Sequence, residues 1–139
     1  MTAPRPVVYV SHHVDEPVRA AYRGSLSPWA DVVFGTDLGE QGRLQAIARA
    51  RVLACFSPIH ELSDAAICEV AHLSLVQCLA AGRDRFPFER FARRTLVAFN
   101  PGAAAGPIAE HAVALLLAAA KNLLPRHHAL AQGRFEQSD

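Results

Sequence analysis

Five short runs of apolar, largely β-branched residues recur along the first hundred residues of this 139-residue chain. Unbroken runs of this kind are typical of strands that are buried on both faces of a sheet. Helical patterns separate them, and strands that alternate with helices predict parallel βαβ units with right-handed crossovers. We therefore predict an α/β fold with a flavodoxin-like, doubly wound sheet of five parallel strands. The predicted strands are 7–10, 30–34, 52–56, 73–79 and 96–99, and the predicted helices are 16–23, 40–50, one capped by Ser63 and Asp64, and 86–94.

A turn at Asn100, Pro101 and Gly102 follows the last predicted strand, and a long Ala/Leu helix begins near Pro107. Proline is favoured at the first position of a helix, where its missing N–H costs nothing. A second short helix is predicted over 126–135. We expect two parts, with residues 1–106 forming the sheet domain. Residues 107–139 would form a long C-terminal crossover helix and a helical tail that makes inter-domain or dimer contacts.

The composition excludes several classes of protein. Hydrophobic residues make up 51% and charged residues 19% of the chain, which argues against disorder. The net charge is +1 and the basic residues are scattered, so nucleic acid is not an expected partner. The longest apolar run, 112–120, is too short to span a bilayer. Three cysteines and no recognisable export signal predict reduced thiols and a cytoplasmic location.

Ligands of doubly wound sheets bind outside the carboxyl ends of the strands, so the residues that follow each strand are the candidates for a site. They include His12, Ser57, His60, the turn at 80–84 and the turn at 100–102. Histidine, arginine and free backbone N–H groups at one edge would suit a small carboxylate or phosphate. The competing interpretation is that each is an ordinary turn residue.

Other groups of residues do not indicate a metal, catalytic or nucleotide-binding site. His12 and His13 are adjacent, and side chains of neighbouring residues leaving a strand diverge, so no metal site is predicted. Cys55, Cys68 and Cys78 show no close spacing and are interpreted as core thiols. The segment Gly102–Gly106 does not match GxGxxG, and GxxxxGK[ST] is absent because the only lysine is Lys121. No catalytic, metal-binding or cofactor-binding residue is therefore assigned.

Two stretches resemble one family. Residues 77–89, Q-C-L-A-A-G-R-D-R-F-P-F-E, are similar to the Q-x-L-G-A-G-V-D-x-x-P/D segment of the D-isomer-specific 2-hydroxyacid dehydrogenases. Residues 100–117, N-P-G-A-A-A-G-P-I-A-E-H-A-V-A-L-L-L, resemble their N-x-x-G-A-N-A-x-x-V-A-E-H-A-L-x-L-x-L segment. Order and spacing agree, and the resemblance covers most of the chain, strongest after Leu73.

The resemblance implies a flavodoxin-like substrate-binding domain of an oxidoreductase that transfers hydride between NAD or NADP and a 2-hydroxy or 2-keto acid. In such domains the backbone of the turn that matches Ala81, Gly82 and Arg83 holds the substrate carboxylate, and the Asn100 turn lies beside it. These four residues, with Ser57, His60 and His12, are the predicted substrate-binding residues. The family's nucleotide loop and its catalytic Arg, Glu and His belong to segments absent from this chain, which would be inactive as a dehydrogenase alone.

Departures from the family pattern leave alternatives open. Ala80 stands where the family has glycine, and Arg83 replaces a small apolar residue. The chain could be a truncated dehydrogenase domain, or the partner of a separate cofactor-binding subunit. It could also be a repurposed stand-alone protein that binds a small acid, or a cofactor-independent enzyme of another class. Apolar residues along 107–124 predict a homodimer through that helix.

Overall fold

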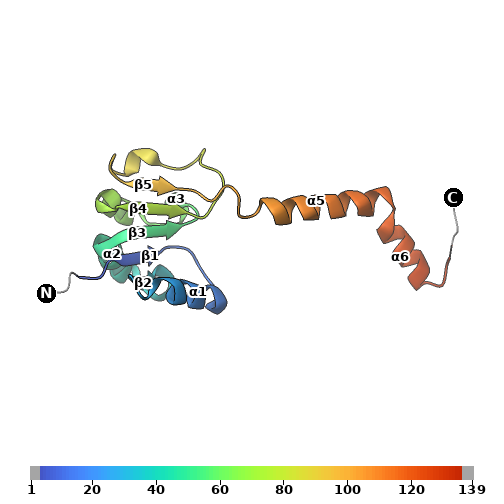
Figure 1. Ribbon diagram of the computed structural model, residues 1–139, viewed down its shortest axis with the longest axis horizontal. Helices are drawn as coiled ribbons and strands as arrows, with labels where there is room; N and C mark the ends of the chain where they lie inside the picture. The colour runs from blue at the N-terminus through green and yellow to red at the C-terminus, as the bar shows by residue number, and fades with distance from the viewer. Residues whose placement is uncertain (1–3, 136–139) are drawn as a thin grey trace. The chain divides into compact units, whose positions relative to one another are not determined.

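The computed structural model describes residues 4–135 of the chain. Its five strands are parallel and lie in the order β2-β1-β3-β4-β5 (Figure 1). This is the strand order of a flavodoxin-like sheet, so the predicted fold class is confirmed. The strands are β1 (Val7–Val10), β2 (Asp31–Phe34), β3 (Ala50–Cys55), β4 (Leu75–Cys78) and β5 (Leu96–Ala98). The helices are α1 (Glu16–Leu26), α2 (Glu40–Arg49), α3 (Pro58–Glu61), α4 (Asp64–Cys68), α5 (Ala105–Ala120) and α6 (Leu123–Ala131), with 3-10 turns η1 (Gly35–Asp37), η2 (Glu69–His72) and η3 (Phe88–Arg90).

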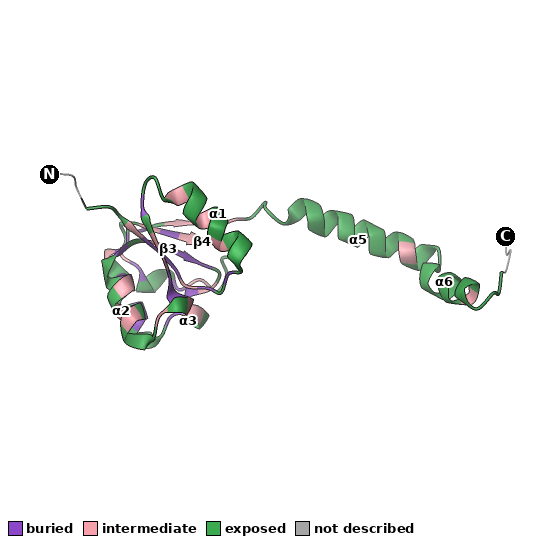
Figure 2. Ribbon diagram, turned by 90° about the horizontal axis from the view of Figure 1, so that it is seen from below, coloured by how far each residue is buried: buried purple, intermediate pink, exposed green. Residues whose placement is uncertain are grey.

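The core consists of two hydrophobic clusters supplied by alternate residues of the strands. Leu53 and Val76 belong to the larger cluster, which includes Ile47 of α2 and Ile67 of α4. Ala54, which points to the opposite face from Leu53, belongs to the second cluster. That cluster also contains Val10, Val14 and Phe34, with Tyr22 of α1 packed against it. Helices therefore lie on both sides of the sheet (Figure 2).

The face that carries α1 is only partly covered. Strand pairing aligns Val52 of β3 with Leu75 of β4, and Leu75 with Leu96 of β5. These residues share the face of Ala54, and α1 lies against β2 at the far edge of the sheet. Leu96 is consequently 71% exposed.

Helix capping follows the sequence, but two predicted helices have different extents. The Asp15 side chain accepts a hydrogen bond from the Val18 N–H (3.2 Å), as expected for the cap of α1. We predicted that this helix would end at residue 23, and this was wrong, since it runs on to Leu26. The predicted helix 86–94 is also wrong. Only the short 3-10 turn η3 forms there, and Pro87 explains why residue 86 is not part of it, because a proline disfavours a helical backbone at the residue before it.

The chain divides into two compact units, Met1–Pro101 and Gly102–Asp139. The predicted boundary at 106/107 lies within the first turn of α5, because that helix begins at Ala105. Pro107 is thus its third residue, where the N–H would lack a helical partner anyway.

The second predicted C-terminal helix also starts earlier than expected, at Leu123, and it ends at Ala131 instead of 135. Gly133, with a left-handed φ of 73°, stops it. None of residues 102–135 is buried (Figure 2). Residues 136–139 of the predicted tail lie outside the described residues.

Among the described residues, no single helix is long and apolar enough to cross a membrane. The α5–α6 pair meets the length and composition required only when the two are taken together, and it is bent by 61°.

The larger cluster should dominate the stability of the first unit. Leu53 is 0% exposed, so we expect Leu53→Ala to lower the free energy of unfolding by about 2–5 kcal/mol. Leu96→Ala, also on a strand but 71% exposed, is the matched control and should cost under about 1 kcal/mol. Urea denaturation followed by circular dichroism would measure both, and equal losses would contradict this assignment of the core.

Candidate functional site

A cavity of about 180 Å³ lies at the carboxyl ends of β3 and β4. Part of its wall follows β3, and the rest comes from the end of β4 and the turn after it. This is the edge of a doubly wound sheet at which ligands bind. The lining residues are Phe56, Ser57, Pro58, Cys78, Ala80, Gly82, Arg85 and Phe86. We call this space the strand-end cavity.

Two of the seven predicted substrate-binding residues, Ser57 and Gly82, line the strand-end cavity. Ala81 and Arg83 are exposed neighbours of Gly82 in the same turn and are not among its lining residues. The Asn100 N–H donates to the Ala80 carbonyl (3.2 Å), which brings the Asn100 turn against the cavity wall.

The two histidines lie outside the lining. His60 is exposed on α3, and His12 is buried just after β1. The binding roles predicted for all seven residues stay predictions, those of Ser57 and Gly82 included.

The turn after β4 accommodates its departure from the family pattern without strain. Neither Ala80 nor Gly82 has a positive φ, so this turn does not require the left-handed conformation that favours glycine. A methyl group at position 80 therefore fits the backbone found here.

Sequence reasoning missed several residues of the cavity wall, among them Phe56, Arg85 and Phe86. Phe56 directly follows β3, and this position was a usable signal because the first residues after a strand lie at its carboxyl end. Arg85 carried no comparable signal. Whether Arg83 or Arg85 faces the cavity depends on the path of the turn, which residue spacing alone does not fix.

Glu61 holds the loop after β3 in place. Its carboxylate accepts hydrogen bonds from the N–H of Phe56 (2.9 Å) and the N–H of Ser57 (2.8 Å). It also accepts one from the Ser11 hydroxyl (2.6 Å), which follows β1. One carboxylate thus ties the end of β1 to two residues that line the strand-end cavity. Ser57 is the N-cap of α3, so Glu61, the last residue of that helix, also satisfies the backbone N–H at its start.

His12 supplies a neutral aromatic ring behind the cavity wall. Its ring packs edge-on against Phe56 with the centroids 4.9 Å apart, and its Nδ1 has no hydrogen-bond partner within residues 4–135. Burial lowers the pKa of His12, although the Glu61 charge and the Ala54 carbonyl act in the opposite direction. The imidazole is therefore neutral near pH 7 and provides no positive charge for an anion.

The Cys55 thiol, next to Phe56 in the chain, is not an activated nucleophile. Burial, with smaller contributions from Cys78 and Glu61, raises the pKa of Cys55 well above its usual range. The Cys78 thiol donates a hydrogen bond to the Phe56 carbonyl (3.1 Å). Within residues 4–135, no group of three or more His, Cys, Asp or Glu residues could hold a metal ion.

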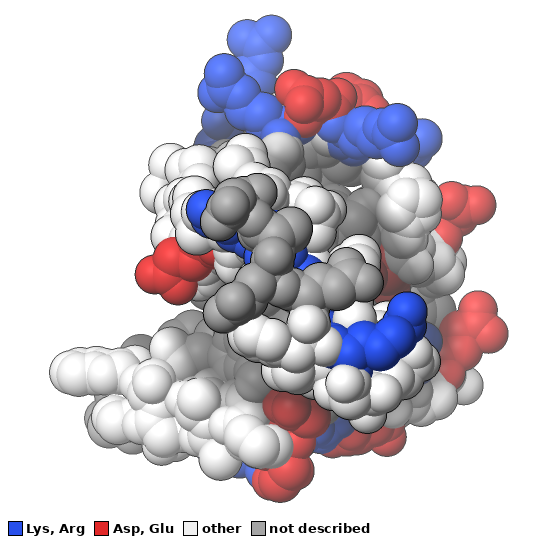
Figure 3. All heavy atoms as spheres, turned by 90° about the vertical axis from the view of Figure 1, so that its right-hand side faces the viewer, with Lys and Arg blue, Asp and Glu red and all other residues white. Residues whose placement is uncertain are grey.

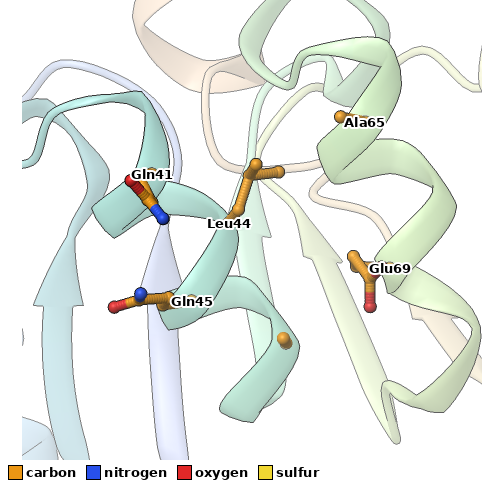
Figure 4. A pocket seen from close by; sticks show the side chains of 6 residues that line it. Gln41, Leu44, Gln45, Ala65 and Glu69 are labelled. Atoms are coloured by element: carbon orange, nitrogen blue, oxygen red, sulfur yellow. The ribbon is translucent and has the colours of Figure 1, made fainter.

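A larger hollow of about 360 Å³ between α2 and α4 is less suited to an acid. Figure 4 shows Leu44 of α2 pointing toward Ala65, with Glu69 farther along the opposite wall and Gln41 and Gln45 also on α2. Its only charged lining residue is Glu69, whose carboxylate would repel an anionic ligand.

The charged side chains on the surface do not form a single-sign patch on the face drawn in Figure 3, where basic and acidic side chains are interspersed. That face therefore shows no basic stripe of the kind that binds nucleic acid.

Comparison with known proteins identifies the fold. No protein-family model matches the sequence, and no curated protein matches it. Among solved structures, it resembles D-lactate dehydrogenase from Aquifex aeolicus, complexed with NAD and lactic acid, with a TM-score of 0.67, 17% identity and 96% of this chain covered. It also resembles the pyruvate reductase of Chlamydomonas reinhardtii, with a TM-score of 0.59, 21% identity and 96% coverage.

The fold is shared with these dehydrogenases. The resemblance predicted from residues 77–89 and 100–117 is thus confirmed in three dimensions, at the level of fold. The match covers only 39% of the D-lactate dehydrogenase chain and 40% of the pyruvate reductase chain. This chain therefore spans about two fifths of the length of either structure.

Acidification should reveal the burial of His12. Its folded pKa lies below the ordinary 6.5, so the unfolded chain binds the proton more readily and stability falls as the pH drops below about 6.5. His12→Gln should lose less free energy of unfolding than the wild type between about pH 7.5 and about pH 5.5. The neighbouring exposed His13 provides the matched control, and His13→Gln should retain the wild-type loss. Urea unfolding at both pH values measures this loss of free energy. An identical loss for wild type and His12→Gln would refute the assignment of His12 as a histidine whose pKa is lowered by burial.

Proposed function

We propose that this chain is a substrate-binding domain of the D-2-hydroxyacid dehydrogenase type and that it binds a small 2-hydroxy or 2-keto acid. One observation carries the proposal: Ala80 and Gly82 line the strand-end cavity. They belong to the turn that the sequence resemblance associates with the substrate carboxylate. The fold shared with D-lactate dehydrogenase and pyruvate reductase supports the same function.

The size of the strand-end cavity supports a small ligand. About 180 Å³ is below the roughly 300–1,000 Å³ typical of drug-sized ligands, and a dinucleotide is larger still. The sequence also contains no GxGxxG or P-loop motif. NAD or NADP would therefore bind to another domain or to a separate subunit, and the chain alone would bind the acid without oxidising or reducing it.

We also propose that the chain forms a homodimer through residues 107–124 and resides in the cytoplasm. Apolar residues point in all directions around α5, and Leu115, Leu116 and Leu117 are 53–69% exposed. A helix that is apolar all round is normally buried, and covering each leucine contributes about 1.5–3 kcal/mol. The unpaired cysteines Cys55, Cys68 and Cys78 are consistent with a reducing compartment.

Isothermal titration of the full chain tests the binding function. The titrants are a panel of small 2-keto and 2-hydroxy acids, NADH and NADPH. We expect an acid to bind and neither nucleotide to bind, because the only cavity that we assign to a ligand is small and lies at the strand ends. Failure of every acid would refute the proposal and favour a repurposed protein. Nucleotide binding would show that the cofactor site has been misplaced.

Sedimentation velocity tests the homodimer. We expect a dimer at micromolar concentration, and Leu116→Glu should shift it to the monomer because a charge would be buried at the interface. Ala20→Glu, which adds the same charge at an exposed position of α1, should remain dimeric. A wild-type monomer would contradict the proposal and favour coverage of α5 by a separate cofactor-binding subunit.

A further inference from the structure

We infer that Arg85 binds the carboxylate of the acid, and that Phe56 and Phe86 select an acid with an aromatic or bulky apolar side chain. This inference rests on the proposed function and deepens it by naming the class of substrate. It adds a residue that the sequence analysis did not name, because the prediction for this turn listed Ala81, Gly82 and Arg83 and assigned the carboxylate to their backbone.

The first step concerns charge. Arg85 is the only charged residue that lines the strand-end cavity. Its guanidinium has no hydrogen bond or ion pair with any of residues 4–135. An arginine presents donors in a fixed fork that matches a carboxylate, so an acid in the cavity would find an uncommitted partner. Arg83 is also exposed, but it does not line the cavity.

The second step concerns the apolar wall. Phe86 stacks on Phe91 with centroids 5.2 Å apart, and it meets the ring of Phe99 edge-on at 5.3 Å. These contacts hold Phe86 in one orientation. Phe56 is fixed separately, by its backbone bond to Glu61 and by the edge-on contact of its ring with His12. Two phenylalanines, one supplied from each strand end, thus form a preorganised apolar wall.

The third step concerns what the cavity disfavours. Besides Arg85, the lining side chains that carry a polar atom are those of Ser57 and Cys78, and the Cys78 thiol already bonds the Phe56 carbonyl. A second carboxylate or a phosphate on the ligand would lose its water without gaining a second cation. The wall therefore favours a monocarboxylic acid whose remaining part is apolar. Aromatic rings are especially suitable, because aromatic pairs gain about 0.5–1.5 kcal/mol beyond burial.

Titration of the full chain with D-3-phenyllactate and D-lactate tests this assignment. We expect D-3-phenyllactate to bind about 10- to 100-fold more tightly, the ratio that corresponds to burial of one aromatic side chain. Arg85→Ala should weaken the binding of D-3-phenyllactate by about 10- to 100-fold, because it removes a charge-assisted hydrogen bond. Arg83→Ala removes the same charge two residues away but keeps the backbone to which the sequence resemblance assigns the carboxylate, so it should change the affinity by less than about threefold.

Phe56→Ala tests the apolar wall independently of the charge. It should abolish the preference for D-3-phenyllactate and leave the affinity for D-lactate within about threefold of the wild type. Thermal unfolding of each variant establishes that it is folded before it is titrated. Arg85 and Phe56 are both exposed, so neither substitution removes a core residue.

The outcomes separate the two proposals. If the wild-type chain binds no acid, the proposed function fails, and this inference fails with it. If acids bind but Arg85→Ala has the wild-type affinity, or Arg83→Ala loses more than Arg85→Ala, the assignment of Arg85 is overturned and the proposed function stands. If D-lactate binds as tightly as D-3-phenyllactate, the selection by Phe56 and Phe86 is overturned.

Discussion

The carboxylate of Glu61 is the contact on which the candidate site depends. A parallel sheet brings the ends of its strands to one edge, but it does not fix the loops that leave them. Glu61 does so by accepting hydrogen bonds from Ser11 after β1 and from Phe56 and Ser57 after β3. Charge-assisted hydrogen bonds are roughly twice as strong as neutral ones. Two loops from neighbouring strands therefore behave as one rigid wall.

A rigid wall matters because the strand-end cavity is small. Ordering a mobile side chain on binding costs about 0.5–1.5 kcal/mol, which a ligand with few atoms recovers with difficulty. Here the side chains of the wall are already ordered in the folded chain, so most of this cost does not arise on binding. Glu61 holds the backbone at Phe56, and Phe91 and Phe99 hold the ring of Phe86. Under the proposed function, the binding energy of a small acid would come from its contact with the Arg85 guanidinium and from burial.

The sequence predicted the sheet well because a parallel strand buried on both faces leaves an uninterrupted apolar run. Val7–Val10 is such a run, and its observed bounds match the prediction. Helix ends were harder to predict. Gly24 in the interior of α1 costs about 1 kcal/mol relative to alanine, and packing of Tyr22 against the core offsets that cost. A local pattern does not report such tertiary compensation.

The candidate site was likewise predictable only in part. Ser57 and Gly82 were predictable because they lie within a few residues of the end of a strand. Glu61 and Arg85 were not, because their roles depend on the direction in which a side chain leaves a short helix or a turn. Phe56 and Phe86 are distant in sequence, and they line the same cavity only because β3 and β4 pair in the sheet. The sequence alone therefore does not indicate that these two residues form one apolar wall.

The chain has a buried apolar core and, apart from it, apolar surfaces that remain exposed. The core of Met1–Pro101 is complete in itself, with Leu53, Val70 and Val76 all at 0% exposure. The face of β4 and β5 that carries Leu96, and the leucines of α5, are apolar surfaces that no described residue buries. Parallel sheets are normally covered on both faces, so these surfaces are where further protein would pack. All the walls of the strand-end cavity belong to the first unit. The acid-binding site that we propose would thus be built from residues of the first unit alone.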